Sequence, residues 1–285
     1  MSVPYAHVIG DPIAQSKSPL IHGFWLEKLG IAGKYKARQV EPSGLAAYLS
    51  ERRDDGSWIG CNVTMPHKQA IIGELDALDP LARKLGAVNT VVRGENGSLK
   101  GFNTDAPGFL EPLETVIEAQ HLFRMARIIG TGGAARAIIA ALADQGFTLV
   151  LAGRDPDKAR KLLDELAPDG EHYAVDLAHF AKPTDFVFDD REGCLDLVIN
   201  ASPLGMSGNP PLLFDWSHAP PGSIAYDIVT NPVETPFLAA ARAAGHPAID
   251  GLAMLIGQAA IAFEKFFGAA PPREYDSELR EILTR

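Results

Sequence analysis

A lysine and an aspartate that could move a proton stand in the first half of the chain. Lys68 ends the segment Asn62-Val63-Thr64-Met65-Pro66-His67-Lys68, and Asp105 ends Asn103-Thr104-Asp105; each segment follows an apparent strand. A lysine serves as a general acid or base when a carboxylate orients it or when its surroundings move its pKa from ~10.4 towards neutrality. Further candidates for proton transfer are His7, His22, His67 and Asp227.

Lys68 and Asp105 also have structural explanations. Pro66 suits the start of a helix, which would place Lys68 in the first turn, where the helix dipole disfavours a cation. A lysine set against the dipole hints at function, although a lone lysine is more often a solvated surface residue. Asp105 precedes a helix whose start is marked by Pro107, so it could instead serve as a helix cap.

Two serines could hold a ligand near the start of the chain. Ser18 stands before Pro19, ahead of a helix expected around Leu20 to Leu29, and this arrangement predicts that Ser18 is the N-cap. Ser16 has no such role. The hydroxyl of Ser16, two residues before Ser18, could point into the same ligand-binding cleft as that of Ser18.

Two amides stand in apolar surroundings. Asn89 falls inside an apolar strand expected over Ala87 to Arg93, and Gln258 interrupts an apolar helix expected over Gly251 to Phe267. A buried amide needs hydrogen-bond partners. For Gln258, a polar ligand and core hydrogen bonding are equally good explanations.

The segment Gly130-Thr131-Gly132-Gly133-Ala134-Ala135 has the pattern G-x-G-x-x-A between an expected strand and an expected helix. Gly130 allows a tight turn, Gly132 lets the backbone approach a pyrophosphate, and Ala135 lets helix and strand pack closely. The free N–H groups at the helix start would face the phosphates. The pattern indicates a dinucleotide-binding loop.

A second strand supports that interpretation. Residues 147–152 are apolar and end in Gly153-Arg154-Asp155, about 20 residues past the loop, where dinucleotide sites contact the ribose 2′ position. Arg154 would suit a 2′-phosphate, because a guanidinium pairs with phosphate in a bidentate way. Arg154 could also be a plain surface arginine after a strand, but the ordered series of strand, loop, helix, strand and polar tip favours the cofactor.

Composition restricts the class of protein. The 285 residues carry a net charge of −10, which argues against a nucleic-acid binder, and 46% of them are hydrophobic, as in ordinary globular proteins. Two cysteines, Cys61 and Cys194, are too few for a disulfide framework. Neither a signal peptide nor an apolar stretch that could span a bilayer is evident, so we expect a cytoplasmic protein that does not bind membranes.

The elements predict an α/β fold with two domains. Strands and helices alternate up to residue 105, and a helix over Pro107 to Gln120 leads into a doubly wound pattern between Arg127 and Asp250. The stretch Ala167 to Gly193 could hold a short strand and a helix. Helices are also expected over Pro42 to Glu51 and Ala77 to Leu85.

Taken together, these segments resemble the motif series of shikimate dehydrogenases, in the same order and over nearly the whole chain. The segments are Ser16-Lys17-Ser18-Pro19, Asn62 to Lys68, Gly86-Ala87-Val88-Asn89-Thr90, Asn103-Thr104-Asp105, Gly130 to Ala135, Asn200-Ala201-Ser202-Pro203-Leu204-Gly205-Met206 and Gly257-Gln258-Ala259-Ala260.

The resemblance implies reversible reduction of 3-dehydroshikimate to shikimate with NADPH, without a metal ion. It implies a substrate-binding domain over 1–105 plus 250–285, in which C-terminal helices complete the N-terminal α/β part, and a Rossmann-like NADP domain over 106–249. Lys68 and Asp105 would be catalytic. Ser16, Ser18 and Thr64 would hold the substrate carboxylate, and Asn89, Asp105 and Gln258 its hydroxyls. The implied cofactor contacts are Gly130, Thr131, Gly132, Gly133, Ala134, Gly153, Arg154, Ile228 and Gly251.

Some residues depart from the family pattern. Thr230 stands where the family commonly has a tyrosine, which leaves open a quinate/shikimate dehydrogenase that uses NAD. Asp155 adds a negative charge beside the expected 2′-phosphate contact. A non-catalytic NADP-sensing protein, or an amino-acid or polyol dehydrogenase on a similar scaffold, would also fit many of these residues. The partner is expected to be a small molecule, and the chain a monomer or a homodimer.

Overall fold

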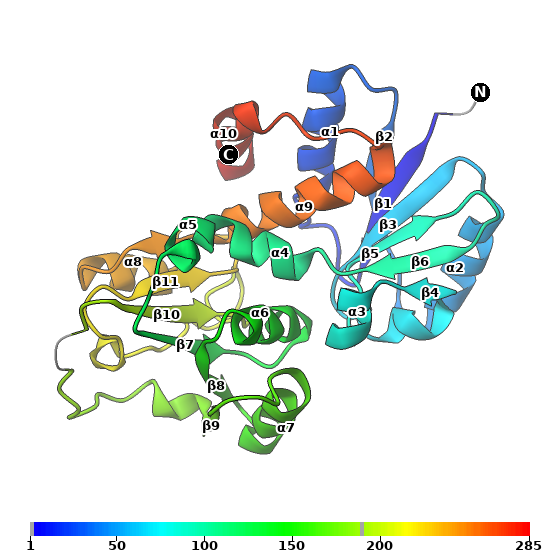
Figure 1. Cartoon of the computed structure of the whole chain (residues 1–285). Coiled ribbons are helices and arrows are strands. Elements are labelled where there is room, and N and C mark those ends of the chain that lie inside the picture. The colour runs from blue at the N-terminus through cyan, green and yellow to red at the C-terminus, as the bar shows by residue number, and fades with distance from the viewer. Residues whose placement is uncertain (1–2, 189–190) are drawn as a thin grey trace. The chain divides into compact units, whose positions relative to one another are not determined.

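The computed structural model of the protein describes residues 3–188 and 191–285 (Figure 1). The chain divides into two compact units. Unit 1 comprises Met1–Gly108 and Ile256–Arg285, and unit 2 comprises Phe109–Leu255. Within the described residues, each unit is built on a six-stranded sheet with helices packed on it, which confirms the predicted α/β class. No helix in the described part of the chain is long and apolar enough to cross a membrane.

Unit 1 holds a mixed sheet in the order β2-β1-β3-β5-β6-β4. Its strands are β1 (Tyr5–Gly10), β2 (Lys34–Gln39), β3 (Trp58–Val63), β4 (Ala77–Leu78), β5 (Thr90–Arg93) and β6 (Leu99–Phe102). β1 runs parallel to β2 and β3, whereas β5 runs antiparallel to both β3 and β6. The ends of β1, β3 and β6 therefore meet the start of β5 at one edge of the sheet.

Helices cover both faces of this sheet. They are α1 (Ser18–Leu29), η1 (Pro42–Gly44), α2 (Leu45–Arg53), η2 (Ala70–Glu74), α3 (Pro80–Leu85), η6 (Arg273–Tyr275), α10 (Asp276–Thr284) and most of α9 (Gly251–Phe267). On one face α2 buries Leu49 against Trp58 in the larger core, and on the other α9 buries Phe266 against Ala6 and Tyr35. Each such large apolar side chain contributes about 2 kcal/mol to stability.

The structure differs from the sequence prediction over Ala77 to Leu85, which was expected to be one helix. Ala77–Leu78 instead forms β4, and α3 begins at Pro80. The Asp79 carboxylate accepts a hydrogen bond from the N–H of Ala82 at 2.7 Å, so Asp79 is the N-cap. A proline fits the first helical position but cannot continue a helix begun earlier, which explains the break.

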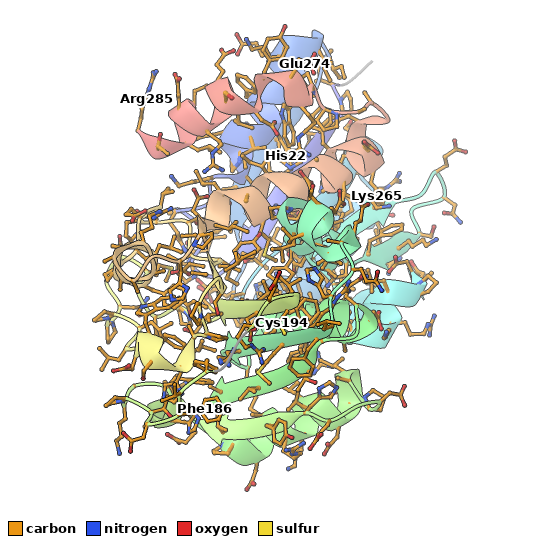
Figure 2. The ribbon with its side chains drawn as sticks, turned by 60° about the vertical axis from the view of Figure 1, so that its left-hand side comes forward. His22, Phe186, Cys194, Lys265, Glu274 and Arg285 are labelled. Carbon is orange, nitrogen blue, oxygen red and sulfur yellow. The ribbon has the colours of Figure 1, made fainter. Side chains whose placement is uncertain are left out.

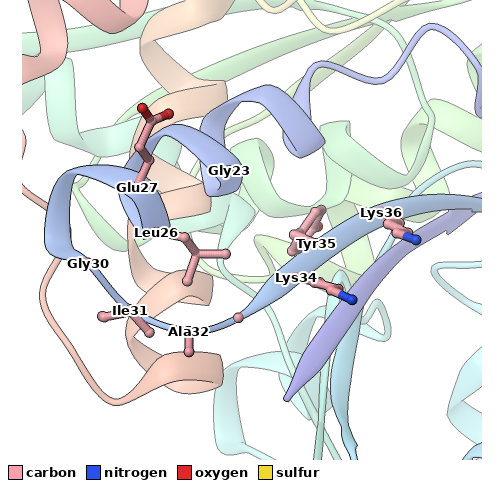
Figure 3. Close-up of a pocket in the computed structure, with 10 residues that line it drawn as sticks. Gly23, Leu26, Glu27, Gly30, Ile31, Ala32, Lys34, Tyr35 and Lys36 are labelled. Atoms are coloured by element: carbon pink, nitrogen blue, oxygen red, sulfur yellow. The ribbon is translucent and has the colours of Figure 1, made fainter. Parts of the chain in front are cut away.

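Strand β2 presents two different surfaces. Tyr35 faces α1 and is 7% exposed, whereas the residues on either side of it in the sequence, Lys34 and Lys36, point to the other face of the sheet (Figure 3). Under α1, the imidazole of His22 stacks on the Tyr35 ring with centroids 3.9 Å apart and planes 1° apart. His22, labelled in Figure 2, is fully buried, and neither ring nitrogen has a hydrogen-bond partner. This desolvation lowers the pKa of His22 to about 3.

Unit 2 holds a parallel sheet in the order β12-β11-β10-β7-β8-β9. Its strands are β7 (Phe123–Ile129), β8 (Thr148–Gly153), β9 (Tyr173–Asp176), β10 (Cys194–Asn200), β11 (Ile224–Asp227) and β12 (Ala248–Ile249). Its helical segments are α4 (Asp105–Leu110, shared with unit 1), η3 (Glu111–Leu113), α5 (Glu114–Glu118), α6 (Gly133–Asp144), α7 (Pro156–Leu166), η4 (Leu177–His179), η5 (Trp216–His218) and α8 (Pro236–Ala243).

This order, with β7 between β10 and β8, is the doubly wound arrangement that the sequence predicts. The stretch from Ala167 to Gly193 holds β9 and the short η4, and Asp189 and Asp190 lie outside the described residues. The single helix expected over Pro107 to Gln120 is instead broken into α4, η3 and α5. The break falls at Pro112, which has no N–H to continue the helical bonding.

Candidate active site

A lysine–aspartate pair lies at the edge of the unit 1 sheet where three strands end. Lys68 Nζ donates a hydrogen bond to Asp105 Oδ2 at 2.5 Å. The side chains of Lys68 and Asp105 are only 16% and 6% exposed, so the ion pair is held largely out of water. Charged groups placed there need good geometry and further hydrogen bonds, and both are present.

The backbone at Lys68 is held by the neighbouring segment and not by a helix. The prediction that Pro66 starts a helix with Lys68 in its first turn is wrong, because residues 65–69 form turns and η2 begins only at Ala70. The carbonyl of Lys68 accepts a hydrogen bond from the N–H of Val88 at 2.7 Å. Lys68 is thereby tied to the segment that precedes β5.

Asp105 opens α4 but does not cap it. The side chain of Asn103 accepts hydrogen bonds from the N–H groups of Asp105, at 3.0 Å, and of Ala106, at 3.3 Å. The carboxylate of Asp105 is thus left to bind Lys68 through one oxygen and the amide of Asn89, at 2.8 Å, through the other. The alternative interpretation of Asp105 as a helix cap is therefore wrong, because its carboxylate binds side chains and Asn103 accepts from the first N–H groups of α4.

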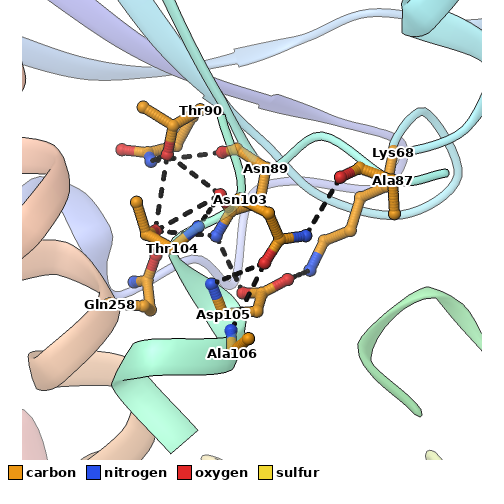
Figure 4. A network of polar contacts seen from close by, with 10 residues as sticks. Lys68, Ala87, Asn89, Thr90, Asn103, Thr104, Asp105, Ala106 and Gln258 are labelled. Carbon is orange, nitrogen blue, oxygen red and sulfur yellow. Dashed lines mark hydrogen bonds and ion pairs between the residues drawn. The ribbon is translucent and has the colours of Figure 1, made fainter. Parts of the chain in front are cut away.

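The amide of Asn89 is the centre of a buried network (Figure 4). Its Nδ2 donates to Asp105 and, at 2.9 Å, to the hydroxyl of Thr104, while its Oδ1 accepts from the N–H of Thr104 at 2.8 Å and from the hydroxyl of Thr90 at 3.0 Å. Asn89 is 3% exposed. With its hydrogen-bonding atoms engaged on both sides, the amide has a fixed orientation.

The network continues away from the ion pair through residues that the sequence did not single out as site residues. Asn62 Nδ2 donates to Thr90 Oγ1 at 3.0 Å, and the Tyr35 hydroxyl donates to Asn62 Oδ1 at 2.6 Å. Burial raises the pKa of Tyr35, and a hydrogen bond with Ser18 acts in the opposite direction. Polar side chains thus connect Ser18 to Asp105. Asn62 carries a sequence signal, being a polar residue in a buried strand, whereas Tyr35 carries none.

The remaining predicted ligand-binding residues have different surroundings. Ser18 is not the N-cap of α1; Lys17 is, and the Ser16 hydroxyl accepts a long hydrogen bond, 3.4 Å, from the N–H of Ser18. Gln258 reaches the network at Thr104, with 3.5 Å between the side-chain oxygens. Among the described residues, neither the Ser16 nor the Thr64 side chain forms a hydrogen bond to this network, so their part in binding the substrate carboxylate stays a prediction.

The other candidates for proton transfer have structural partners. His67, 1% exposed, donates from Nε2 to the carbonyl of Val40 at 2.6 Å, and His22 is the buried stacked ring described above. His7 Nδ1 lies 2.8 Å from the hydroxyl of Tyr48. None of these rings contacts Lys68 or Asp105 in the described hydrogen bonds. Lys68, by contrast, forms the ion pair with Asp105.

In unit 2 the glycine-rich loop connects β7 to α6. Gly130 has a φ of +122°, and a Cβ there would lie 2.6 Å from the carbonyl oxygen of Ala201, so only glycine fits. At Gly132, the N-cap of α6, a Cβ would meet no atom within 4 Å. Ala135 is fully buried. The loop backbone and the start of α6, with Thr131, Gly133 and Ala134, are therefore open to a ligand, and exposed N–H groups there suit a pyrophosphate.

The end of β8 provides the other residues expected to bind the cofactor near this loop. Gly153 fits closely beside Thr131, since a Cβ would lie 2.8 Å from the Thr131 methyl. Arg154 is exposed after it. The carboxylate of Asp155 accepts a hydrogen bond from the N–H of Lys158 at 3.1 Å, so Asp155 caps α7. This cap gives the acidic side chain a structural role beside Arg154.

Ile228 and Gly251, two implied cofactor contacts far apart in sequence, lie against each other. A Cβ on Gly251 would lie 2.7 Å from the carbonyl carbon of Ile228. The segment after β11 is fixed by Asp227, which is fully buried and accepts hydrogen bonds from Asn200 at 3.0 Å, from the N–H of Val229 at 3.0 Å and from the hydroxyl of Thr235 at 2.6 Å. Burial raises the pKa of Asp227.

A buried lysine–aspartate pair in one unit, together with a phosphate-binding type of loop on a Rossmann-like sheet in the other, defines a two-unit α/β oxidoreductase that uses a dinucleotide. Comparison with known proteins narrows this class. The chain matches the shikimate dehydrogenase substrate binding domain over residues 8–91 and the shikimate 5′-dehydrogenase C-terminal domain over residues 251–276. The chain belongs to the shikimate dehydrogenase family.

Individual relatives span the whole chain. The shikimate dehydrogenase (NADP(+)) of Sphingopyxis alaskensis is 49% identical over 98% of this chain and 97% of its own length. The corresponding protein of Paramagnetospirillum magneticum is 43% identical over 98% of this chain and 97% of its own length. The crystal structure of shikimate 5-dehydrogenase from Thermus thermophilus, in complex with NADP(H) and shikimate, is 35% identical, has a TM-score of 0.79 and covers 98% of this chain and 99% of that one.

Proposed function

We propose that the protein catalyses the reversible reduction of 3-dehydroshikimate to shikimate with NADPH. The observation that carries the proposal is the buried Lys68–Asp105 pair, oriented by Asn89, in a chain of this family. A ketone that receives a hydride needs a proton at its oxygen, and a positioned lysine supplies one. The same lysine accepts the proton when the reaction runs towards the ketone.

Unit 1 would bind the substrate. Asn89, Asp105 and Gln258 offer both donors and acceptors, which suits the hydroxyl groups of a polyol. Ser16, Ser18 and Thr64 would hold the carboxylate. Asn89 Nδ2 donates to Thr104 and to Asp105 in this structure, so on binding it would exchange its bond to Asp105 for one to a substrate hydroxyl.

Lys68 would act at the substrate carbonyl oxygen. Its ammonium group donates a proton to that oxygen as the carbon accepts a hydride, so that the C=O group becomes CH–OH and Lys68 is left neutral. Asp105 keeps Lys68 in place through the 2.5 Å hydrogen bond. Solvent then returns a proton to Lys68, which is 16% exposed.

Unit 2 would bind NADP(H), whose reduced form would supply the hydride. The open space at Gly132, the N-terminus of α6 and the exposed Arg154 fit the pyrophosphate and the 2′-phosphate of this cofactor. The carboxylate of Asp155 is engaged at the start of α7, which supports a preference for NADP despite its charge. Ile228 and Gly251 would complete the cofactor contacts.

A spectrophotometric assay tests the substrate and the cofactor together. Shikimate and quinate are each combined with NADP and NAD, and reduced cofactor is followed at fixed pH. We expect the highest kcat/KM with shikimate and NADP. Turnover with quinate or a clear preference for NAD would replace the proposed function with that of a quinate/shikimate dehydrogenase that uses NAD. Cofactor binding without turnover of any pair would overturn the proposed reaction.

Two variants test the proposed roles of Lys68 and Asp105. Lys68→Ala should lower kcat by about 10²- to 10⁴-fold, the usual contribution of a general acid, and leave the affinity for NADP nearly unchanged. Asp105→Asn should lower kcat and raise KM for shikimate. Lys100→Ala, an exposed lysine on β6 of the same sheet, is the matched control and should retain activity. Near-normal kcat in Lys68→Ala would remove Lys68 from the mechanism.

We also propose that the enzyme is cytoplasmic and acts as a monomer or a homodimer. Cys61 and Cys194 are both free thiols, in keeping with a reducing compartment. Cell fractionation tests the location, and analytical ultracentrifugation tests the oligomeric state.

A further inference from the structure

A second cavity of about 490 Å³ opens on the α2 side of the unit 1 sheet, and it shares no residue with the candidate active site. Its lining comes from three neighbouring elements. The residues are Tyr5 and His7 from β1, Lys34, Lys36, Ala37 and Arg38 from β2, and Tyr48, Glu51 and Arg52 from α2. The proposed reaction uses none of them.

The charge of this cavity opposes that of the whole chain. Lys34, Lys36, Arg38 and Arg52 face a single acidic lining residue, Glu51, whereas the chain carries a net charge of −10. In the parallel pairing with β1, Tyr5 lies opposite Lys34 and His7 opposite Lys36. Alternate residues of a strand are about 7 Å apart, so the three β2 cations form a row of about 13 Å along one rim.

The cations of the row are not neutralised by the protein. In the described part of the chain, the side chains of Lys34, Lys36 and Arg38 form no ion pair or hydrogen bond. Figure 3 shows Lys34 and Lys36 directed away from the side on which Tyr35 lies. Like charges kept side by side without counter-charges repel one another, and an anion placed among them would relieve that repulsion.

The inner wall of the cavity is pre-organised. Arg52 donates to the Tyr5 hydroxyl at 2.6 Å and pairs with Glu51 at 3.2 Å and with Asp55 at 3.1 Å. The Tyr48 hydroxyl lies 2.8 Å from Nδ1 of His7. The wall therefore places a fixed guanidinium group near an imidazole in a fixed orientation.

We propose that this cavity binds a small polyanion, a molecule with two or more negatively charged phosphate or carboxylate groups. Its charged oxygens would bind along the row of Lys34, Lys36 and Arg38, and one end would reach the inner wall at His7 and Arg52. Such a ligand would be bound separately from the substrate and the cofactor.

Binding of such an anion should also change the pKa of His7. Desolvation and the nearby charges of Arg52, Arg38 and Lys36 lower the pKa of His7 to about 4, whereas Asp55 acts in the opposite direction. Lys34, Glu51, Tyr5 and Tyr48 complete the titratable groups around it. A bound anion would offset the cationic part of this shift and raise the pKa of His7, so binding would take up a proton and tighten as the pH falls towards that raised pKa.

Isothermal titration with pyrophosphate and with citrate tests the proposal. Saturating NADP is present throughout, so that the cofactor site cannot take up the probe. We expect saturable binding of at least one probe, which weakens with added salt because the cations are exposed. The probe that binds more tightly distinguishes phosphate from carboxylate groups. Histidine resonances followed by NMR should show an upward shift in the pKa of His7 on binding.

The double variant Lys36→Ala/Arg38→Ala should bind at least tenfold more weakly, since each charge contact contributes a factor of a few. Arg83→Ala, an exposed arginine on α3 of the same unit, is the matched control and should bind as the wild type does. Equal affinity of the wild type and the double variant, or no saturable binding of either probe, would overturn the proposal.

Discussion

The buried ring of His22 predicts that the protein loses stability at mildly acidic pH. His22 is fully buried and its pKa is lowered to about 3 from 6.5, because no partner offsets the desolvation of the charged form. In the unfolded chain the same ring would take up a proton near pH 6.5. The unfolded state therefore binds more protons than the folded state below pH 6.5, and the free energy of unfolding must fall as the pH decreases.

The size of the effect follows from the shift. Each pH unit between 6.5 and 3 removes about 1.4 kcal/mol, so the loss from His22 alone is about 2 kcal/mol at pH 5 and levels off at about 5 kcal/mol near pH 3. A loss of 2 kcal/mol is a large fraction of the total stability of a typical protein. His7 acts in the same direction, with a smaller effect because it is only partly buried and water screens its charge.

Urea unfolding of the wild type and His22→Phe at pH 7.5, 6.0 and 5.0 measures this contribution. Phenylalanine keeps a planar ring against Tyr35 and cannot titrate, so the stability of the variant should fall by about 2 kcal/mol less than that of the wild type between pH 7.5 and pH 5.0. His218→Gln, which removes a histidine of unit 2, controls for the loss of one imidazole. Parallel pH curves for the wild type and His22→Phe would refute the reasoning.

Two further predictions concern packing and buried polar groups. Gly108→Ala should destabilise the protein by about 2 kcal/mol, because the new Cβ would lie 2.4 Å from the backbone nitrogen of Gln258. Gly23→Ala, on an open part of α1, should instead stabilise the protein by about 0.5–1 kcal/mol. Urea midpoints that shift in the same direction in both variants would contradict this prediction. Asp227→Ala should lower the free energy of unfolding by about 3 kcal/mol, because three buried donors lose their acceptor. Thr235→Val, which removes one of these donors, should lower it by about 1 kcal/mol. Equal losses of stability in calorimetry would show that the donors find other partners.

The sequence predicts elements well where several local signals agree. Helix α7 begins at Pro156 as expected, with a proline in the first turn and an acidic N-cap before it. The apolar runs of β7 and β8, separated by a helical pattern, predict the parallel pairing that the structure contains. Local propensity is enough in these cases because no tertiary contact opposes it.

The predictions that failed depend on contacts between distant residues or on one-residue shifts. Ser18 lies inside α1 and Lys17 occupies the N-cap position, so the boundary differs from the expected one by one residue. The need of Asn89 for a partner could be read from the sequence, but its partners Thr104 and Asp105 come from another strand end, and only the pairing of β5 with β6 brings them near. The contribution of Tyr35 had no local signal, because it stands in a polar strand.

The division of unit 1 between the two ends of the chain has a consequence during synthesis. The β1 and β2 surface around Ala6 and Tyr35 is covered by Ala262 and Phe266 of α9, which leave the ribosome only after the whole of unit 2. Unit 2 can acquire its complete sheet while this apolar surface of the nascent chain still faces solvent or a chaperone. The order of translation therefore requires the interrupted unit to finish folding last, although its first strand is made first.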